Sequence, residues 1–437
     1  MEPNVLLLLA TAACIGLFVL GSPMLIVLGM WVVAAHLTYG FPLQNIGSSM
    51  FEGLNSFALL AAPLFILTGD LIGGGGIARR IIEFTLSALS WLRGGLAMAS
   101  IGASGFFAAI SGSNAATTAT IGSITFPAMV KENYGQGFAA ATAAAGGTVG
   151  IIIPPSILFI VYGFLVNLPI SELFLAGIVP GCLLVIGMQI ACWLVCSRMG
   201  YGNVRPFSLK ATADKAPGFM LAVFAVALVL WGLYTGAFSP TEAAAVTVVY
   251  CLFAGFVLTR ELKLRDIPDL VFRSGMIVGL IMPLVAVSLV MQQMFAVVGV
   301  STLVGNLLEG LGNYYVILAV CMLVVFIAGM FLESVPITII LAPIMAPVMV
   351  KAGADPFHFA VVFVVGTAIG FVTPPFGLNL FVASSVSGVP YLRIAWYVLP
   401  YLAALLLTWF LIALVPVLST YLVQFAGLSG GGIKMTR

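Results

Sequence analysis

Long apolar runs alternate with short polar segments along nearly the whole chain. A membrane-crossing helix needs about 20 largely apolar residues, and ten runs predict such crossings. They lie near 4–20, 24–38, 55–76, 137–166, 172–196, 217–236, 241–259, 274–298, 357–386 and 394–418. The pattern predicts an all-α polytopic membrane protein. The run 4–20 lacks a basic leading segment and a small-residue cleavage site, so we interpret it as a first span.

Two further apolar segments, 95–130 and 313–350, are interrupted in the middle by polar residues. The first is broken at 111–114 (SGSN) and the second at 333–336 (ESVP). Irregular backbone at membrane depth is tolerated only where protein or a water-filled cavity satisfies its polar groups. We therefore predict two re-entrant helical hairpins, each of which enters and leaves on the same side of the membrane.

The same pattern occurs twice, at a fixed offset of 220 residues. Residues 126–131 (FPAMVK) recur as 346–351 (APVMVK), and the proline pair at 154–155 recurs at 374–375. Further prolines and glycines obey the same offset. Internal repeats in a membrane protein indicate an interface between two halves, which is where transporters bind their cargo.

The distribution of Lys and Arg predicts how the two halves are oriented. Cations gather in three places, at 79–93, 198–215 and 260–273. By the positive-inside rule all three belong on the cytoplasmic side. This holds if 95–130 returns to the side from which it came, which gives each half five crossings and one hairpin. Because five is odd, the two repeats are predicted to have inverted topology.

This count divides the chain into four parts. They are a first repeat at 1–196 with hairpin 95–130 and broken helix 137–166, a cytoplasmic linker at 197–216, a second repeat at 217–418 with hairpin 313–350 and broken helix 357–386, and a tail at 419–437. Segments 40–54 and 261–273 are amphipathic and too short to cross. Helices lying on the membrane surface and plain loops both remain open for them.

Composition agrees with a membrane protein and excludes several functions. Apolar residues make up 62% of 437 and charged residues 7%, against roughly 25% charged in soluble domains. The net charge of +2 says nothing about nucleic acid. No phosphate-binding loop of the G-x-x-x-x-G-K-[ST] type occurs, so the chain is not expected to hydrolyse ATP. The six cysteines form no Cys-x-x-Cys pair, and Na⁺ is the only metal expected.

Each hairpin is followed by a glycine-rich helix with a proline pair, at 146–155 and 366–375. Proline removes a backbone donor and frees carbonyl groups of the preceding turn. Such carbonyls, with hydroxyl and amide oxygens from a neighbouring loop, suit a small hard cation such as Na⁺, and half-helix N-termini suit a carboxylate. A packed proline kink is the alternative. Two matched sites beside polar hairpin tips favour ion or substrate binding.

The two tips differ, because Ser113-Asn114 corresponds to Glu333-Ser334. An acid within a membrane segment costs roughly 2.5–3.5 kcal/mol on insertion scales, unless it meets a cation or holds a proton. A water-exposed tip is the other interpretation of Glu333. For Asp70, an intramembrane and an interfacial position are equally open.

An enzymatic interpretation rests on Ser104, which lies in a G-x-S-G sequence like that of intramembrane serine proteases. Such a serine needs a histidine base within hydrogen-bond reach. The two histidines, His36 and His358, are expected near the membrane surface, His358 as a helix cap. Close helix packing is therefore the favoured role of the small residues here. A passive channel is the other alternative, although paired broken helices favour alternating access.

Several of these motifs resemble the large membrane subunit of TRAP (tripartite ATP-independent periplasmic) transporters. They are 111–117 (SGSNAAT), 126–131, 137–141 (GFAAA), 153–156 (IPPS), 355–359 (DPFHF), 373–381 (TPPFGLNLF), 239–245 (SPTEAAA) and 76–80 (GIARR). The resemblance covers nearly the whole chain, and the motifs are specific in combination.

The resemblance implies Na⁺-driven import of an organic acid, such as a C4-dicarboxylate or a sialic acid, across the bacterial inner membrane. It implies a periplasmic binding protein that delivers the substrate and a small four-helix membrane subunit, expected here as a separate chain. It also implies a fold similar to transporters that work by an elevator mechanism, with hairpins and broken helices in a mobile domain.

Carried over by motif, the resemblance implies two Na⁺ sites. The first comprises Ser111, Ser113, Asn114, Gly146, Gly147, Gly150 and Pro154. The second comprises Glu333, Ser334, Gly366, Thr367, Gly370, Thr373 and Pro374. Candidate substrate contacts are Asn114, Thr117, Ser156, Thr338 and Asn379. The second tip departs from the Ser-Asn of related transporters. No arginine lies inside a broken helix to clamp a carboxylate, since Arg393 sits at the end of a span.

Overall fold

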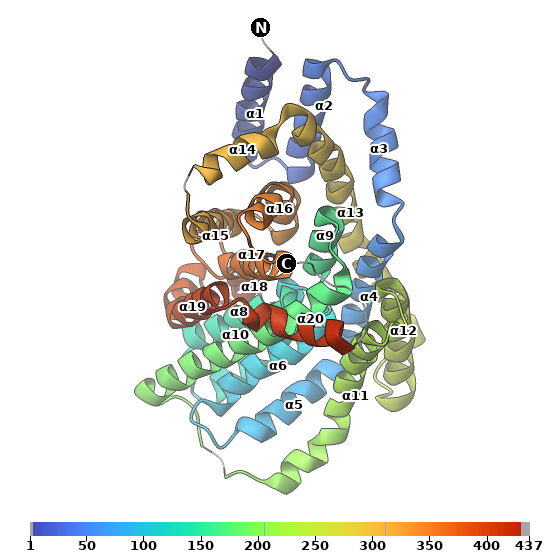
Figure 1. The fold of residues 1–437 in the computed structure, drawn as a ribbon. Helices are drawn as coiled ribbons and strands as arrows, with labels where there is room; N and C mark the ends of the chain where they lie inside the picture. Colours follow the sequence, from blue (N-terminus) through green and yellow to red (C-terminus); the bar gives the residue numbers. More distant parts are fainter. Residues whose placement is uncertain (1–2, 205, 311, 430–437) are drawn as a thin grey trace.

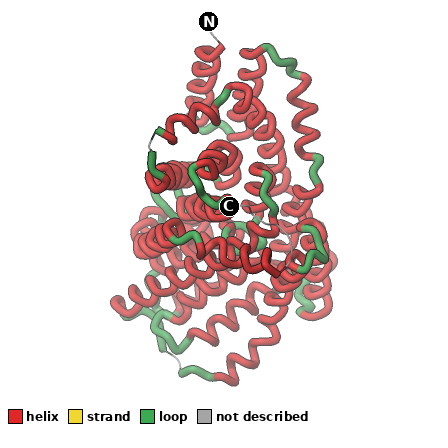
Figure 2. Tube along the Cα trace, in the orientation of Figure 1, coloured by secondary structure: helices red, strands yellow, loops and turns green. Residues whose placement is uncertain are grey.

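The computed structural model describes residues 3–204, 206–310 and 312–429. These residues form helices joined by short loops, without a strand among them (Figure 2). The predicted all-α class is therefore confirmed. Residues 430–437 of the predicted tail lie outside the described residues.

Ten α-helices occupy the first half of the chain (Figure 1). They are α1 (Pro3–Val19), α2 (Met24–Tyr39), α3 (Gln44–Leu54), α4 (Ala61–Gly74), α5 (Ile77–Leu89), α6 (Gly95–Ser111), α7 (Asn114–Lys131), α8 (Gln136–Gly147), α9 (Ile157–Val166) and α10 (Ile170–Met199). The 3₁₀ turns η1 (Phe57–Leu60) and η2 (Thr148–Ile151) precede α4 and follow α8.

Ten more α-helices occupy the described part of the second half. They are α11 (Leu209–Tyr234), α12 (Pro240–Phe253), α13 (Ile267–Val298), α14 (Val300–Glu309), α15 (Tyr314–Phe331), α16 (Ser334–Lys351), α17 (Pro356–Gly370), α18 (Leu378–Ser387), α19 (Tyr391–Leu414) and α20 (Val417–Ser429). The π-helical turn η3 (Ala254–Leu258) extends α12, and the 3₁₀ turn η4 (Leu264–Asp266) precedes α13.

Among the described residues, eight helical segments are long and apolar enough to cross a membrane. They are Phe57–Gly74, Ile170–Met199, Leu209–Tyr234, Pro240–Leu258, Leu264–Val298, Tyr314–Phe331, Ser334–Lys351 and Tyr391–Leu414. Both arms of the second hairpin are in this set, so their length alone would also allow them to cross. Re-entry of the hairpins stays a prediction.

The helix boundaries at the two hairpin tips coincide at the 220-residue offset. α6 ends at Ser111 and α15 at Phe331, while α7 begins at Asn114 and α16 at Ser334. The hairpin arms of one half also pack on the broken helix of the other, since α7 contacts α18 and α16 contacts α9. The two halves therefore interlock around their broken helices.

Amphipathic segments account for the helices that the apolar runs do not predict. α5 buries Ile77, Ile81 and Ile82 and packs between α6 and α11. Its polar face pairs with other elements, because Glu83 bonds Lys215 of α11 at 2.8 Å. Helices α14 and α20 were likewise not predicted. α14 lies between the predicted crossing 274–298 and the predicted hairpin 313–350, and most of α20 lies in the predicted tail.

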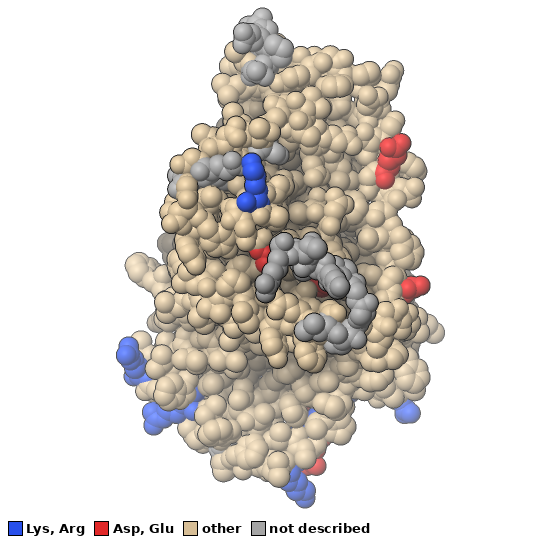
Figure 3. Space-filling view, viewed as in Figure 1, with Lys and Arg blue, Asp and Glu red and all other residues tan. Residues whose placement is uncertain are grey.

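The two short amphipathic segments, 40–54 and 261–273, differ in structure. Residues 44–54 of the first form helix α3, which has no buried residue. The second, 261–273, is not a separate surface element, because its last residues belong to α13, which runs without a break to Val298. Most of the surface seen in Figure 3 is uncharged, and its Lys and Arg gather mainly at the end near α5, α10 and α11.

Candidate functional site

The first hairpin tip is a sharp break between two buried helices. α6 ends at Ser111, and Gly112 takes a left-handed conformation (φ +59°) that favours glycine. Ser113 then caps α7, and its side chain accepts a hydrogen bond from the backbone N–H of Ala116 at 3.4 Å. The polar residues predicted at this break thus reverse the chain and start the second arm.

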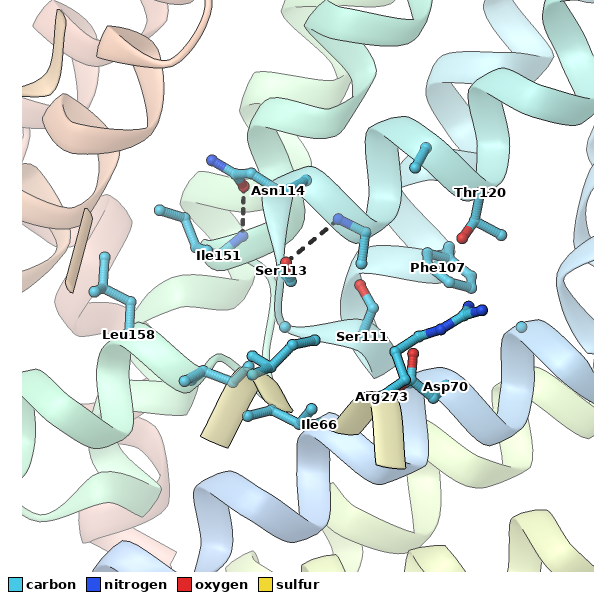
Figure 4. A pocket seen from close by; sticks show the side chains of 18 of the residues that line it. Ile66, Asp70, Phe107, Ser111, Ser113, Asn114, Thr120, Ile151, Leu158 and Arg273 are labelled. Atoms are coloured by element: carbon cyan, nitrogen blue, oxygen red, sulfur yellow. Dashed lines mark hydrogen bonds between the residues drawn. The ribbon is translucent and has the colours of Figure 1, made fainter. Parts of the chain in front are cut away.

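This tip packs directly on the first broken helix. The Asn114 Oδ1 accepts a hydrogen bond from the Ile151 N–H at 2.9 Å (Figure 4). A Cβ at Gly150 would lie 2.5 Å from the Ser113 carbonyl oxygen and 2.7 Å from the Asn114 nitrogen. The glycine is therefore required by close backbone approach, and the predicted residues Ser113, Asn114 and Gly150 are brought together.

Buried polar atoms without a hydrogen-bond partner lie at the same junction. They include Asn114 Nδ2, Thr118 Oγ1 and Thr148 Oγ1. Thr118 faces Gly147, where a Cβ would collide with its hydroxyl. Sequence reasoning missed both threonines, although a helical period places Thr118 one turn from Asn114. Unpaired oxygens in a dry interior are costly unless a ligand meets them.

The second tip is built differently. Glu333 precedes α16 in the position of Ser113, but its side chain makes no capping hydrogen bond. Gly370 packs against Gly329 of α15, and Thr373 donates to the Ile369 carbonyl at 2.8 Å. The turn after the second proline pair reaches the end of α15, where Gly377 N–H contacts the Met330 carbonyl oxygen at 3.5 Å.

Not all residues of the second predicted site approach this tip. A Cβ at Gly366 would meet Trp409 of α19. The Thr367 hydroxyl donates to the Val364 carbonyl of its own helix at 2.8 Å. These two residues lie in the packing between helices, whereas Glu333 and Ser334 line the cavity described below.

Most predicted substrate contacts make internal hydrogen bonds. Thr117 bonds the Ser111 hydroxyl at 2.9 Å, and Thr338 donates to the Ser334 carbonyl at 2.8 Å. Ser156 caps α9 by accepting from Phe159 N–H at 3.3 Å. Asn379 donates through Nδ2 to the Ala144 carbonyl at 3.2 Å and leaves its Oδ1 without a partner. Asn114 is the member of this predicted set that lines the cavity.

A cavity of about 470 Å³ lies between the two tips. Residues 111–114 line one side, and Glu333, Ser334 and Val335 line another. Ile66, Phe107 and Leu158 give it apolar walls (Figure 4). Its size is typical of small-molecule sites, which combine apolar walls with a few convergent polar groups.

Two charged residues of this cavity come from helices outside the hairpins. Asp70 of α4 and Arg273 of α13 lie side by side next to Ser111 (Figure 4). The Asp70 Oδ2 accepts a hydrogen bond from the Ser274 hydroxyl at 2.6 Å. Asp70 therefore lines the cavity.

Sequence reasoning missed Arg273 because it counted this residue with the cytoplasmic cations. A helical signal was present, since Leu270, Arg273, Ile277 and Ile281 follow at intervals of three or four. All four line the cavity. The arginine that faces the site thus belongs to the unbroken helix α13 and to neither of the broken helices.

The residues of the enzymatic alternative have structural roles. Ser104 Oγ donates to the Ser100 carbonyl at 2.9 Å, and the serine packs against Gly146. The prediction that His358 caps a helix is wrong. Asp355 caps α17, while the buried His358 ring contacts Ser419 Oγ and the Ala413 carbonyl at 3.3 Å.

The family described as "Tripartite ATP-independent periplasmic transporter, DctM component" matches residues 4–418. An isethionate TRAP permease, DctMQ of Oleidesulfovibrio alaskensis, is 36% identical over 94% of this chain, and the chain spans 64% of that relative's length. The C4-dicarboxylate large permease of Pseudomonas aeruginosa is 35% identical over 88% of this chain and 91% of its own. The sialic acid large permease of Vibrio cholerae is 32% identical over 84% and 86%.

Two solved structures share the fold. The YdaH transporter of Alcanivorax borkumensis aligns with a TM-score of 0.59 at 16% identity, over 89% of each chain. MtrF of Neisseria gonorrhoeae, from a class of antimetabolite efflux pumps, aligns with a TM-score of 0.59 at 15% identity, over 87% of this chain and 84% of its own.

The fold and the helix breaks around one cavity are those of a membrane transporter. The chain belongs to the TRAP transporter family, as a large permease subunit. It is a multi-pass protein of the bacterial inner membrane and a transporter rather than an enzyme. Transport in this family is independent of ATP, in agreement with the missing phosphate-binding loop.

Proposed function

We propose that this permease imports an organic acid together with Na⁺, by an elevator motion of the hairpins and broken helices. The observation that carries the proposal is the cavity that both polar tips line, with Asn114 on one side and Glu333 on the other. Interrupted helices at a repeat interface are the usual site of cargo and coupling ion in secondary transporters.

Na⁺ coupling is supported by the oxygen atoms at the first tip. Thr118 and Thr148 are buried and their hydroxyls have no partner, close to the glycine turn of the broken helix. A small cation with hydroxyl, carbonyl and carboxamide ligands would satisfy such atoms. At the second tip the Glu333 carboxylate is free of capping and would supply a negative charge to a second ion.

The substrate class follows from the relatives. The compounds in their names include isethionate, C4-dicarboxylates and sialic acid, which are organic anions. We assign an organic acid to this chain on that basis. A periplasmic binding protein would deliver it, and a small membrane subunit would pair with this chain, as the tripartite family description suggests.

The elevator mechanism rests on the inferred inverted repeats. Matching helix boundaries at one offset and the Lys and Arg distribution support two halves of opposite orientation. The interlocked unit of hairpins and broken helices would move against α1–α5 and α11–α13 as a scaffold. Motion of this kind exposes one site to each side of the membrane in turn.

Reconstitution with the partner subunit and the loaded binding protein tests this function. We expect uptake of the bound organic acid to require an inward Na⁺ gradient and to stop when K⁺ replaces Na⁺. Full uptake in Na⁺-free medium under an imposed pH gradient would contradict the choice of ion. Flux that does not depend on the binding protein would instead favour a channel.

A further inference from the structure

The charged groups of the cavity are few. Among the described residues that line it, Asp70, Arg273 and Glu333 are the ionisable ones at neutral pH, and Arg273 is the one cation. Asp70 and Arg273 belong to segments apolar enough to span a membrane, Phe57–Gly74 and Leu264–Val298. Ionisable residues in such segments are rare and usually mark a substrate or ion path.

Arg273 is placed to bind a ligand in addition to its electrostatic interaction with Asp70. Its side chain is exposed, and it acts on the Asp70 carboxylate electrostatically. One oxygen of that carboxylate is held by the Ser274 hydroxyl, which fixes the acid beside the arginine. A guanidinium has five N–H donors in a planar fork, and it can bind a carboxylate or a sulfonate through two of them.

We propose that Arg273 binds the anionic group of the transported solute when the mobile unit and the scaffold enclose the cavity as in this structure, and that the cavity selects solutes with a single such group. The inference rests on the proposed function, transport of an organic acid, and narrows its substrate class. A second carboxylate would meet Asp70 and Glu333, with no second cation among the described residues of the walls. If a Na⁺ ion neutralises Glu333, Arg273 is still the one cationic side chain among those residues, and it lies beside Asp70.

The rest of the cavity suits an uncharged body. Ile66, Phe107, Leu158 and Phe371 provide apolar surface, while Thr120 and Ser123 add hydroxyl groups. The expected solute therefore has one carboxylate or sulfonate at one end and a neutral, partly apolar or hydroxylated remainder. Dicarboxylates of the same length are expected to bind more weakly.

Binding to the purified full-length chain in detergent, in Na⁺ buffer, tests this assignment with two matched pairs of probes. The pairs are gluconate with glucarate and butyrate with succinate, and calorimetry or thermal stabilisation measures the affinity. We expect at least one monocarboxylate to bind at least about tenfold more tightly than its dicarboxylate partner. Equal or tighter binding of the dicarboxylates, or no binding by any probe, would overturn the proposal.

Three variants separate a binding role of Arg273 from a structural one. R273Q should lower the affinity for the monocarboxylate at least about tenfold, whereas R265Q, at an exposed arginine that does not line the cavity, should not change it. D70N keeps an acceptor for Ser274 but removes the competing charge, so it should raise the affinity. Unchanged binding by R273Q, or weaker binding by both R273Q and D70N, would contradict the assignment.

Thermal stabilisation by Na⁺ alone, measured on the same samples, reports on the proposed function separately. Suppose that Na⁺ stabilises the wild type and R273Q equally, but the dicarboxylates bind as tightly as the monocarboxylates or no probe binds. The inferred substrate class is then wrong and Na⁺ coupling stands. If Na⁺ has no effect but R273Q loses monocarboxylate binding, the anion site stands and the Na⁺ assignment fails.

Discussion

At the scale of single residues, the two hairpin tips perform the same chain reversal with different chemistry. Ser113 caps α7 and Asn114 holds the broken helix through Ile151 N–H. Glu333 and Ser334 occupy the matching positions, yet the Glu333 side chain does not cap α16. Its carboxylate is therefore available to the cavity rather than to the backbone.

Replacing Asn114 by alanine removes the acceptor of the buried Ile151 N–H. An orphaned buried donor costs about 1–3 kcal/mol, so we expect a lower melting temperature and a loss of uptake. The control is N306A, at an exposed asparagine of α14 that does not line the cavity. Uptake by N114A equal to that of N306A would remove Asn114 from the site.

For Glu333→Gln we expect intact folding, because the substituted side chain makes no cap and keeps its size. Loss of the carboxylate charge beside a bound ion should raise the Na⁺ concentration for half-maximal uptake by about tenfold or more, which corresponds to about 1.4 kcal/mol. Glu52→Gln, at an exposed acid of α3, provides the comparison. An unchanged Na⁺ dependence in Glu333→Gln would show that this carboxylate does not bind the ion.

At the scale of elements, the breaks in the helices were predictable and the amphipathic helix α5 was not. Proline pairs and polar tips signal where a helix must end, whatever surrounds it. α5 carries arginines and a glutamate among its isoleucines, so a search for apolar runs passes over it. Arg273 was misplaced for a related reason, because a count of loop charges ignores the helical face on which a residue lies.

At this scale, the close approach of Gly150 to the first hairpin tip can be tested by substitution. G150A would press a methyl group into the Ser113–Asn114 backbone, and overpacking of this kind usually costs 1–3 kcal/mol. We expect a lower melting temperature and impaired uptake. In contrast, G279A adds a methyl group to open space in α13 and should leave the protein equally or more stable. Equal behaviour of the two variants would refute the close approach.

At the scale of the whole molecule, the repeat organises both the packing and the cavity. α7 packs on α18 and α16 on α9, so each hairpin is held by the opposite half. The offset of 220 residues could be found from the sequence alone. The interlocking could not, because it depends on contacts between residues far apart, such as Asn379 with the Ala144 carbonyl.

Cross-linking across the proposed boundary tests the elevator motion. Gln292 of α13 bonds the Leu165 carbonyl of α9 at 3.2 Å. Cysteines at these positions, in a background without the six native cysteines, should therefore be bridged by a cleavable bifunctional thiol reagent, and uptake should stop until the bridge is cleaved. Cysteines at Ser87 and Thr212, whose hydroxyls lie 2.9 Å apart within the proposed scaffold, should join without effect. Full transport by the cross-linked 165–292 protein would contradict motion at this boundary.

The central claim, coupling of the organic acid to Na⁺, is tested most directly by measuring both fluxes at once. Proteoliposomes that contain this chain and its partner subunit, supplied with loaded binding protein, would receive radiolabelled Na⁺ and labelled solute together. We expect solute entry to be accompanied by Na⁺ entry in a fixed ratio, and both to be lost in N114A. Solute entry without any accompanying Na⁺ would contradict the account.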